Sequence, residues 1–299
     1  MNPIVKSLYS KKGLQVFLES QGMRTARALG QHFFLNHAML HDILQAAAYP
    51  HEGKILEIGP GLGHLTWALL EHGLDVVAIE KDQRFATLLE TVIERAPEWH
   101  SRVEVRRDDA LKTDFGALQE ETGARYAIGN LPYNVAVPIL FHVAYSQAHF
   151  DQMGFMVQKE VGERMTAPHG KKPYGRLSIV LQYLFDIEPT LLIPPSAFFP
   201  PPKVESLFVT LKPRPGADKE FAKRFLERVV HVAFLHRRKK LRKVLRNSII
   251  ERRTLDDDLL DRAAERFHFE DRAEHWPVQQ WVEFAHFIQE QPRCDQENA

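Results

Sequence analysis

The sequence predicts an α/β fold with a Rossmann-like parallel sheet, followed by a small all-α domain. Short apolar runs alternate with helix-like stretches up to residue 212, which is typical of a parallel sheet covered by helices. From residue 216 onward the pattern is helical. We therefore expect a Rossmann-like domain with a basic N-terminal extension over residues 1–212, and a helical domain over residues 216–299. The Pro- and Gly-containing segment 212–216 would join them.

Hydrophobic periodicity places the individual elements. Strands are expected at residues 54–58, 75–80, 103–106, 126–128, 154–158, 183–192 and 206–211. Helices are expected at residues 37–48, 64–72, 83–95, 137–147, 159–166, 220–235, 237–250, 256–267 and 278–291. The two late strands could add an antiparallel edge to the sheet.

Length and composition narrow the class of protein. A chain of 299 residues with 44% hydrophobic residues can bury a sizeable core. No apolar run approaches the ~20 residues that span a bilayer, and the N-terminus lacks a signal-peptide core. Cys294 is the single cysteine, which leaves no intrachain disulfide and no cysteine-based zinc site. We expect a cytoplasmic monomer without a metal. We interpret the 15 histidines as scattered, without the spacing of a metal site, and therefore as surface or core residues and not as ligands.

A glycine-rich turn follows the first strand of the expected sheet. Residues 59–63 read Gly-Pro-Gly-Leu-Gly, and such glycines allow a tight turn and a close ligand. A dinucleotide-binding G-x-G-x-x-G turn would need a small residue at position 64, where His64 stands. The spacing, with Glu57 two residues before the turn, resembles the first motif of methyltransferases that use S-adenosylmethionine.

Two acids follow later strands at positions suited to a nucleoside. Glu80 lies about 20 residues beyond the glycine turn, where a carboxylate can accept hydrogen bonds from ribose hydroxyls. Asp109 follows the third strand and could accept a hydrogen bond from an adenine amine. Either acid alone could be an ordinary surface charge, and the order of the motifs favours the cofactor site.

The segment after the fourth strand reads Gly-Asn-Leu-Pro-Tyr-Asn over residues 129–134. The side-chain oxygen of Asn130 and the carbonyl of Leu131 are two acceptors for an exocyclic amine. Pro132 restricts the backbone, and Tyr133 offers a flat face for a base. Taken alone the segment could be an ordinary turn. It is suited to holding an amine while a group is transferred to its nitrogen.

The formal net charge of zero hides a strong asymmetry. Residues 223–253 hold 12 Lys or Arg and 2 Glu, a net charge of +10, whereas residues 254–299 carry −8. Such a basic segment attracts a polyanion such as RNA, although a solvated helix face is an alternative. The residues expected to bind RNA are Arg237, Arg238, Lys239 and Lys240.

The ordered motifs resemble those of the small-subunit ribosomal RNA adenine N6,N6-dimethyltransferases, the KsgA type. The similarity covers residues 29–250 and includes a Leu-Gly-Gln segment at 29–31 and a Gln-Lys-Glu-Val segment at 158–161. It continues through residues 174–178, the Phe-Phe-Pro-Pro-Pro-Lys-Val-Glu-Ser segment at 198–206, and the basic segment after Ala233. His32 departs from many relatives, which have Asn there.

The resemblance implies S-adenosylmethionine as cofactor and a role for each matching residue. His32 and Phe34 would approach the methionine end of the cofactor. Gly59 and Gly61 would admit its backbone, Glu80 would bind the ribose and Asp109 the adenine. Asn130 would lie between cofactor and substrate, and Phe198 would stack on the base opposite Tyr133.

The resemblance also implies methyl transfer to two adjacent adenosines near the 3′ end of 16S rRNA, in the small ribosomal subunit and during its biogenesis. Positioning of the amine would suffice, so we expect no acid or base catalyst. Two alternatives stay open. One is a large-subunit (23S) rRNA adenine methyltransferase of the macrolide-resistance type, and the other is a non-catalytic RNA-binding assembly factor.

Overall fold

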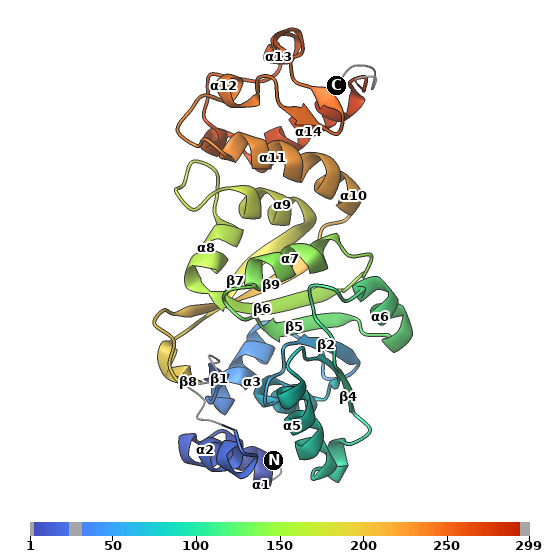
Figure 1. The fold of residues 1–299 in the computed structure, drawn as a ribbon, viewed down its shortest axis with the longest axis vertical. Helices are drawn as coiled ribbons and strands as arrows, with labels where there is room; N and C mark the ends of the chain where they lie inside the picture. Colours follow the sequence, from blue (N-terminus) through green and yellow to red (C-terminus); the bar gives the residue numbers. More distant parts are fainter. Residues whose placement is uncertain (1–2, 24–31, 294–299) are drawn as a thin grey trace. The chain divides into compact units, whose positions relative to one another are not determined.

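A computed structural model describes residues 3–23 and 32–293 of the chain. The chain forms two compact units (Figure 1): Met1–Gly162 with Glu188–Lys212, and Glu163–Ile187 with Pro213–Ala299. The first unit ends at the expected boundary after Lys212. Residues 163–187, which we expected in the first domain, instead pack with the helical unit. The reason is tertiary: Tyr174 is fully buried in the helical core, and its hydroxyl donates to the Trp276 carbonyl at 2.9 Å.

A seven-stranded sheet forms the centre of the first unit, in the order β4-β3-β2-β5-β6-β9-β7. The strands are β2 (Lys54–Ile58), β3 (Asp75–Ile79), β4 (Val103–Arg106), β5 (Tyr126–Asn130), β6 (Gln152–Gln158), β7 (Phe185–Ile193) and β9 (Ser206–Pro213). The five neighbouring strands β4, β3, β2, β5 and β6 are parallel to one another, and β9 pairs antiparallel with β6. The expected α/β class and its antiparallel edge are confirmed.

The register aligns the carboxyl ends of the central strands. Ile58, the last residue of β2, lies opposite Ile79 on one side and Gly129 on the other. Asn130 ends β5, the glycine turn follows β2, and Glu80 follows β3. All three therefore lie at the carboxyl ends of the parallel strands, where open α/β sheets bind ligands.

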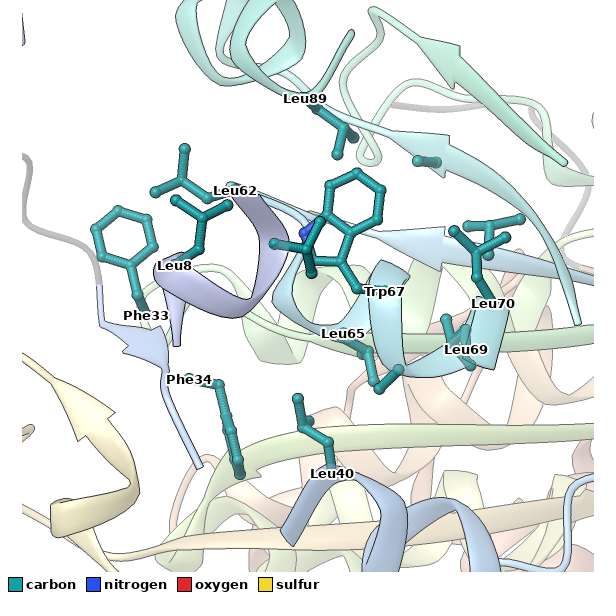
Figure 2. Packing of buried hydrophobic residues seen from close by; sticks show 14 of the residues in the cluster. Leu8, Phe33, Phe34, Leu40, Leu62, Leu65, Trp67, Leu69, Leu70 and Leu89 are labelled. Carbon is teal, nitrogen blue, oxygen red and sulfur yellow. The ribbon is translucent and has the colours of Figure 1, made fainter. Parts of the chain in front are cut away.

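Helices pack against the sheet and around a buried apolar core (Figure 2). Those in or bordering the first unit are α1 (Pro3–Leu8), α2 (Lys11–Ser20), α3 (His37–Ala46), α4 (His64–His72), α5 (Gln83–Glu94), α6 (Phe115–Thr122), α7 (Ala136–Tyr145) and α8 (Lys159–Thr166), with single turns η2 (Pro97–Trp99) and η3 (Pro195–Ala197). The expected helices at 37–48, 64–72, 83–95, 137–147 and 159–166 are confirmed to within two residues. The amphipathic N-terminal pair α1 and α2 was not predicted.

The N-terminal segment is tied to the start of α4. Leu8 lies beside Leu62 in the core (Figure 2), and its carbonyl accepts a hydrogen bond from His64 Nε2 at 3.1 Å. The Tyr9 hydroxyl donates to the His64 carbonyl at 2.5 Å. A second tie is the antiparallel pair β1 (Phe33–Phe34) and β8 (Phe198–Phe199), which sets Phe34 opposite Phe198.

The second unit is mainly helical and carries a short hairpin. It contains α9 (Arg176–Leu184), α10 (Lys219–Phe221), a π-helical turn η4 (Ala222–Leu226), α11 (Glu227–Phe234), α12 (Leu241–Leu245), β10 (Ile249–Ile250), β11 (Arg253–Thr254), α13 (Asp257–Ala264), η5 (Ala273–His275) and α14 (Val278–Glu290). The expected helix at 237–250 is wrong. Turns surround the short α12, and β10 pairs with β11 through a two-residue turn.

No helix in residues 3–23 and 32–293 is both long and apolar enough to cross a membrane.

Candidate active site

The glycine turn after β2 opens toward solvent at its first residue. Gly59, Gly61 and Gly63 all have positive φ values, of 72°, 56° and 81°. A Cβ atom on Gly59 would meet nothing within 4 Å, whereas one on Gly63 would lie 2.7 Å from both Leu89 and Trp67. Gly59 therefore leaves space at the strand ends, and Gly63 serves the packing of α4 against the core.

Glu80 braces this turn. Its side chain is buried, with Oε2 accepting from the Gly61 N–H at 3.0 Å and Oε1 from the Asp82 N–H at 2.8 Å. Burial raises the pKa of the Glu80 carboxyl, and the two backbone donors oppose that effect. The acid that we expected to bind the ribose thus lies against the glycine turn.

Glu57 is a further buried acid of this site that the sequence analysis did not assign. It is 1% exposed in the middle of the sheet, and the Thr66 hydroxyl donates to its Oε2 at 2.6 Å. Burial raises the pKa of Glu57 to about 8. The available signal was a carboxylate inside an apolar strand, two residues before the glycine turn.

Asp109 follows β4 and lies near the end of β3. Its Oδ2 contacts Lys81 Nζ at 2.7 Å, and its Oδ1 accepts from the Leu111 N–H at 3.0 Å. The hydrogen bond from Lys81 lowers the pKa of the Asp109 carboxyl. The carboxylate is therefore ionised and able to accept from an amine.

Asn130 ends β5 with its side chain partly buried. Within residues 3–23 and 32–293, no group hydrogen-bonds to its side-chain amide. The next residue is fixed: Leu131 is buried, and its N–H donates to the Met156 carbonyl on β6 at 3.1 Å. Pro132 is exposed, and its carbonyl accepts from the Val135 N–H at 3.0 Å. The loop backbone is thus held in place while the Asn130 amide is available.

Tyr133 is held by two residues from distant parts of the chain. Its hydroxyl lies 2.8 Å from the Ser206 hydroxyl, and its ring stacks on the His32 ring at 6.0 Å between centroids. His32 Nδ1 in turn donates to the Pro200 carbonyl at 2.6 Å. The structure therefore brings His32 to the loop of residues 129–134, as a neighbour of Tyr133.

Phe34 and Phe198 lie in the core. Their side chains are 3% and 2% exposed, and the two rings meet edge to face at 4.8 Å. Among the described residues, the ring contact of Tyr133 is with His32 and that of Phe198 is with Phe34. The structure does not place Phe198 as an exposed platform opposite Tyr133. Leu29, Gly30 and Gln31 of the N-terminal motif lie outside the described residues.

The four expected RNA-binding residues divide into two kinds. Arg237 donates to the carbonyls of Lys172 and Tyr174 and pairs with Glu274, and Lys240 pairs with Glu270 at 2.5 Å. Arg238 and Lys239 are exposed, and no ion pair joins them to the described part of the chain. Acids of the segment 254–299, which carries a net charge of −8, thus form ion pairs with Arg237 and Lys240. Arg238 and Lys239 are available to an external anion.

A cluster of two histidines and a glutamate lies on the helices next to the glycine turn, and the sequence analysis missed it. His37 and His41 on α3 contact Glu71 on α4. The two Nε2 atoms and the Glu71 Oε2 atom lie 2.7–3.1 Å from one another. The expectation that the histidines are scattered is wrong for this pair. Three residues separate them, and that spacing places both on one face of a helix.

The residues at the strand ends fit a nucleoside cofactor. Gly59 leaves open space where any other residue would carry a Cβ atom, Glu80 is positioned by the turn, and Asp109 presents an ionised carboxylate on the neighbouring strand end. Among these residues, Glu80, Asp109 and the glycine backbone would hold S-adenosylmethionine. When bound, it supplies a methyl group on a positively charged sulfur.

Comparisons with known proteins identify the family of this chain. The family model of the ribosomal RNA adenine dimethylases matches residues 22–290. A ribosomal RNA small subunit methyltransferase A from Cupriavidus metallidurans is 39% identical over 278 residues, covering 90% of this chain and 94% of that protein. The protein of the same name from Rhodospirillum rubrum is 40% identical over 234 residues, covering 78% and 80%.

Solved structures share the fold. A dimethyladenosine transferase from Plasmodium falciparum superimposes with a TM-score of 0.66 at 24% identity, over 86% of this chain and 98% of that one. The 23S rRNA methyltransferase ErmE gives a TM-score of 0.60 at 21% identity, over 86% and 100%. The family model and the curated relatives span most of the chain. The chain belongs to the ribosomal RNA adenine dimethylase family, whose members are methyltransferases that use S-adenosylmethionine.

Proposed function

We propose that this enzyme dimethylates the N6 atoms of two adjacent adenosines near the 3′ end of 16S rRNA, within the small ribosomal subunit and during its biogenesis in the cytoplasm. The observation that carries the proposal is the available amide of Asn130, at the end of β5 beside the glycine turn. The relatives that match over most of the chain are named as small-subunit enzymes, which supports this substrate over 23S rRNA.

The chain's own residues would aim the target amine. The Asn130 side-chain oxygen and the Leu131 carbonyl would accept hydrogen bonds from the two amine hydrogens. These bonds draw the nitrogen out of conjugation with the ring, so that its lone pair points away from the two acceptors. Positioned acceptors of this kind act without a general base, because a methylated, cationic amine loses its proton readily.

The adenine must leave its base stack to reach this loop. Tyr133 would form the platform for the extruded ring, since Ser206 and His32 hold it in one orientation. Base stacking on an aromatic ring contributes about 1–3 kcal/mol. Phe198 would support the pocket from within the core, through Phe34 and the β1–β8 pair.

The RNA would meet the second unit at Arg238 and Lys239. Both side chains are exposed, and neither is ion-paired within the part of the chain that the structure describes. We propose that the enzyme acts as a monomer, with RNA contacts from each unit.

The test uses labelled S-adenosylmethionine and small subunits from a strain that lacks the enzyme. After incubation, the labelled nucleotides are mapped by mass spectrometry of nuclease digests. Label on two adjacent adenosines near the 3′ end of 16S rRNA is the expected result. Label on 23S rRNA alone in a mixed-subunit reaction would favour the macrolide-resistance type. Cofactor binding without transfer to either RNA would favour the assembly factor.

A further inference from the structure

The cluster of His37, His41 and Glu71 lies outside the methyl-transfer machinery. His37 and His41 stand one turn apart on α3, and Glu71 stands in the last turn of α4. Glu71 Oε2 lies 2.7 Å from His37 Nε2 and 3.1 Å from His41 Nε2, and the two ring nitrogens are 3.0 Å apart. Three potential ligand atoms therefore converge on one point from two helices.

Hydrogen bonds alone do not satisfy this triangle. If both histidines carry a proton on Nε2 and donate to Glu71, two N–H groups face each other at 3.0 Å. If only one ring carries that proton, the bare nitrogen of the other ring faces the carboxylate oxygen at 2.7 or 3.1 Å. With an ionised Glu71, each arrangement therefore leaves one of the three atom pairs unfavourable. Either two donors or two acceptors face each other, and a hydrogen bond needs one of each.

A divalent ion removes the conflict, because all three lone pairs can point at it. Zinc binds histidine nitrogen at about 2.0–2.1 Å and carboxylate oxygen at about 2.0–2.2 Å, so neighbouring ligands of a tetrahedral site lie about 3.3 Å apart. The observed separations of 2.7–3.1 Å would need to widen by roughly 0.2–0.6 Å. Three protein ligands would leave the fourth position to water.

The surroundings suit an ion that enters from solvent. The side chains of His37, His41 and Glu71 are 29%, 36% and 18% exposed, so the ligand atoms are accessible yet partly shielded. The Tyr9 ring packs edge-on against His37 at 4.7 Å and limits its rotation. Because Tyr9 is also bonded to the His64 carbonyl, an ion here would connect α3, α4 and the N-terminal segment.

We propose that His37, His41 and Glu71 bind one divalent transition-metal ion of the zinc class, which fastens α3 to α4 beneath the N-terminal segment. Imidazole nitrogen favours such ions over magnesium, which prefers oxygen ligands in an octahedron. The ion would join the two helices, and the methyl-transfer residues are not among its ligands.

The test is calorimetric titration of chelator-treated full-length protein with ZnCl₂, on a Cys294→Ser background so that the thiol does not compete. We expect one equivalent to bind at pH 7.5, a Tm increase on the order of 5 °C at saturation, and no response to MgCl₂. CoCl₂ should give the intense visible bands of a four-coordinate site.

Two variants and a matched control decide the assignment. His41→Ala and Glu71→Gln should each weaken zinc binding by about 100-fold or more, with circular dichroism unchanged. His149→Ala removes an exposed histidine outside the cluster and should bind zinc like the parent. Methyl transfer should persist in His41→Ala, which separates this proposal from the proposed function. Equal zinc affinity in His41→Ala and His149→Ala, or no zinc binding by the parent, would overturn the proposal and leave a hydrogen-bonded cluster only.

Discussion

At the scale of single residues, some polar side chains of the candidate site already have hydrogen-bond or ion-pair partners, and one does not. Glu80 accepts two backbone hydrogen bonds, and Asp109 holds Lys81, whereas the Asn130 amide has no partner in the described part of the chain. The sequence predicted the chemical type of each residue. It could not show which acceptors are occupied, because partners such as Ser206 for Tyr133 lie more than 70 positions away.

Replacing Asn130 should separate catalysis from cofactor binding. In Asn130→Ala the amine loses one of its two acceptors, so single-turnover transfer should fall by about 10²–10³. Cofactor affinity measured by calorimetry should change by less than about threefold, since Glu80 and the glycine turn are intact. Asn134→Ala, an exposed residue of the same loop, is the control and should keep its activity. Comparable rates in both variants would contradict the role of Asn130.

Glu57 predicts a stability change with pH. Its folded pKa of about 8 lies above the ordinary value of 4.5, so between these values the folded state holds one proton more than the unfolded state. Stability therefore falls as pH rises through this window, by about 1.4 kcal/mol per unit, and the loss is complete above pH 8. In Glu57→Gln, whose amide oxygen can still accept from Thr66, this dependence should disappear.

Urea unfolding of cofactor-free protein at pH 5 and pH 8 measures the effect. The variant should gain stability relative to the parent by on the order of 3 kcal/mol between the two pH values. Glu52→Gln, an exposed carboxyl, should follow the parent. Parallel pH profiles for Glu57→Gln and the parent would show that Glu57 is ionised in the folded protein.

At the scale of elements, apolar periodicity predicted the central strands well. The bounds of β2 and β4 equal the expected 54–58 and 103–106. Strand β2 is mostly buried and largely apolar, whereas β4 lies at the edge of the sheet and alternates valine with charged residues. Periodicity failed at residues 237–250. The two-residue turn between β10 and β11 is made by Glu251 and Arg252 with φ values of 48° and 63°, a conformation usually signalled by glycine or asparagine.

That hairpin is stabilised by contacts that no local pattern encodes. Glu251 accepts from Arg224 at 2.8 Å and pairs with Arg228 at 3.0 Å, both from the preceding helical segment. Each non-glycine residue in the left-handed region costs roughly 1–2 kcal/mol, which these ion pairs help to offset. The short β1–β8 pair escaped prediction for a related reason, since its partners are 164 or more positions apart.

The glycine turn allows a matched pair of substitutions. Gly59 and Gly123 have φ values of 72° and 71°, and a Cβ atom on either would meet nothing within 4 Å. Gly59→Ala and Gly123→Ala should therefore lose a similar 1 kcal/mol or so of stability. Only Gly59→Ala should lose cofactor affinity, by at least about tenfold, because its methyl group would fill the open space at the strand ends. Equal cofactor affinities would place the cofactor elsewhere.

At the scale of the whole molecule, the charge asymmetry changes meaning once the chain is folded. The −8 segment supplies partners to the +10 segment, as in the pairs of Arg242 with Asp261 and Arg246 with Asp257, both at 2.6 Å. The opposed charges therefore serve the fold of the helical unit as well as any RNA contact. The net charge of each segment could not distinguish these uses, because a count of charges does not show which residues pair with each other in the folded chain.

The salt dependence of RNA binding should reveal which cations are used. The double variant Arg238→Ala and Lys239→Ala should reduce the slope of log affinity against log salt by about 2, if each cation displaces one counterion. Arg242→Ala should lower the Tm and leave that slope unchanged, since Asp261 and Asp257 already occupy its guanidinium. Binding of a small-subunit rRNA fragment at several salt concentrations measures both. An unaltered slope in the double variant would place the RNA on another surface.

The residues that hold Tyr133 and His32 in place are synthesised late, which matters for folding during translation. The His32 ring is held by Pro200, and the Tyr133 hydroxyl by Ser206, so the early residues of the pocket depend on residues that the ribosome adds much later. Until β9 emerges, the edge of β6 has no antiparallel partner and offers free backbone groups to other chains. A nascent chain shorter than about 206 residues thus contains Asn130 and the glycine turn but no ordered pocket. We expect a chain that ends in this stretch to lack the supports of Tyr133 and to expose the edge of β6, which favours aggregation.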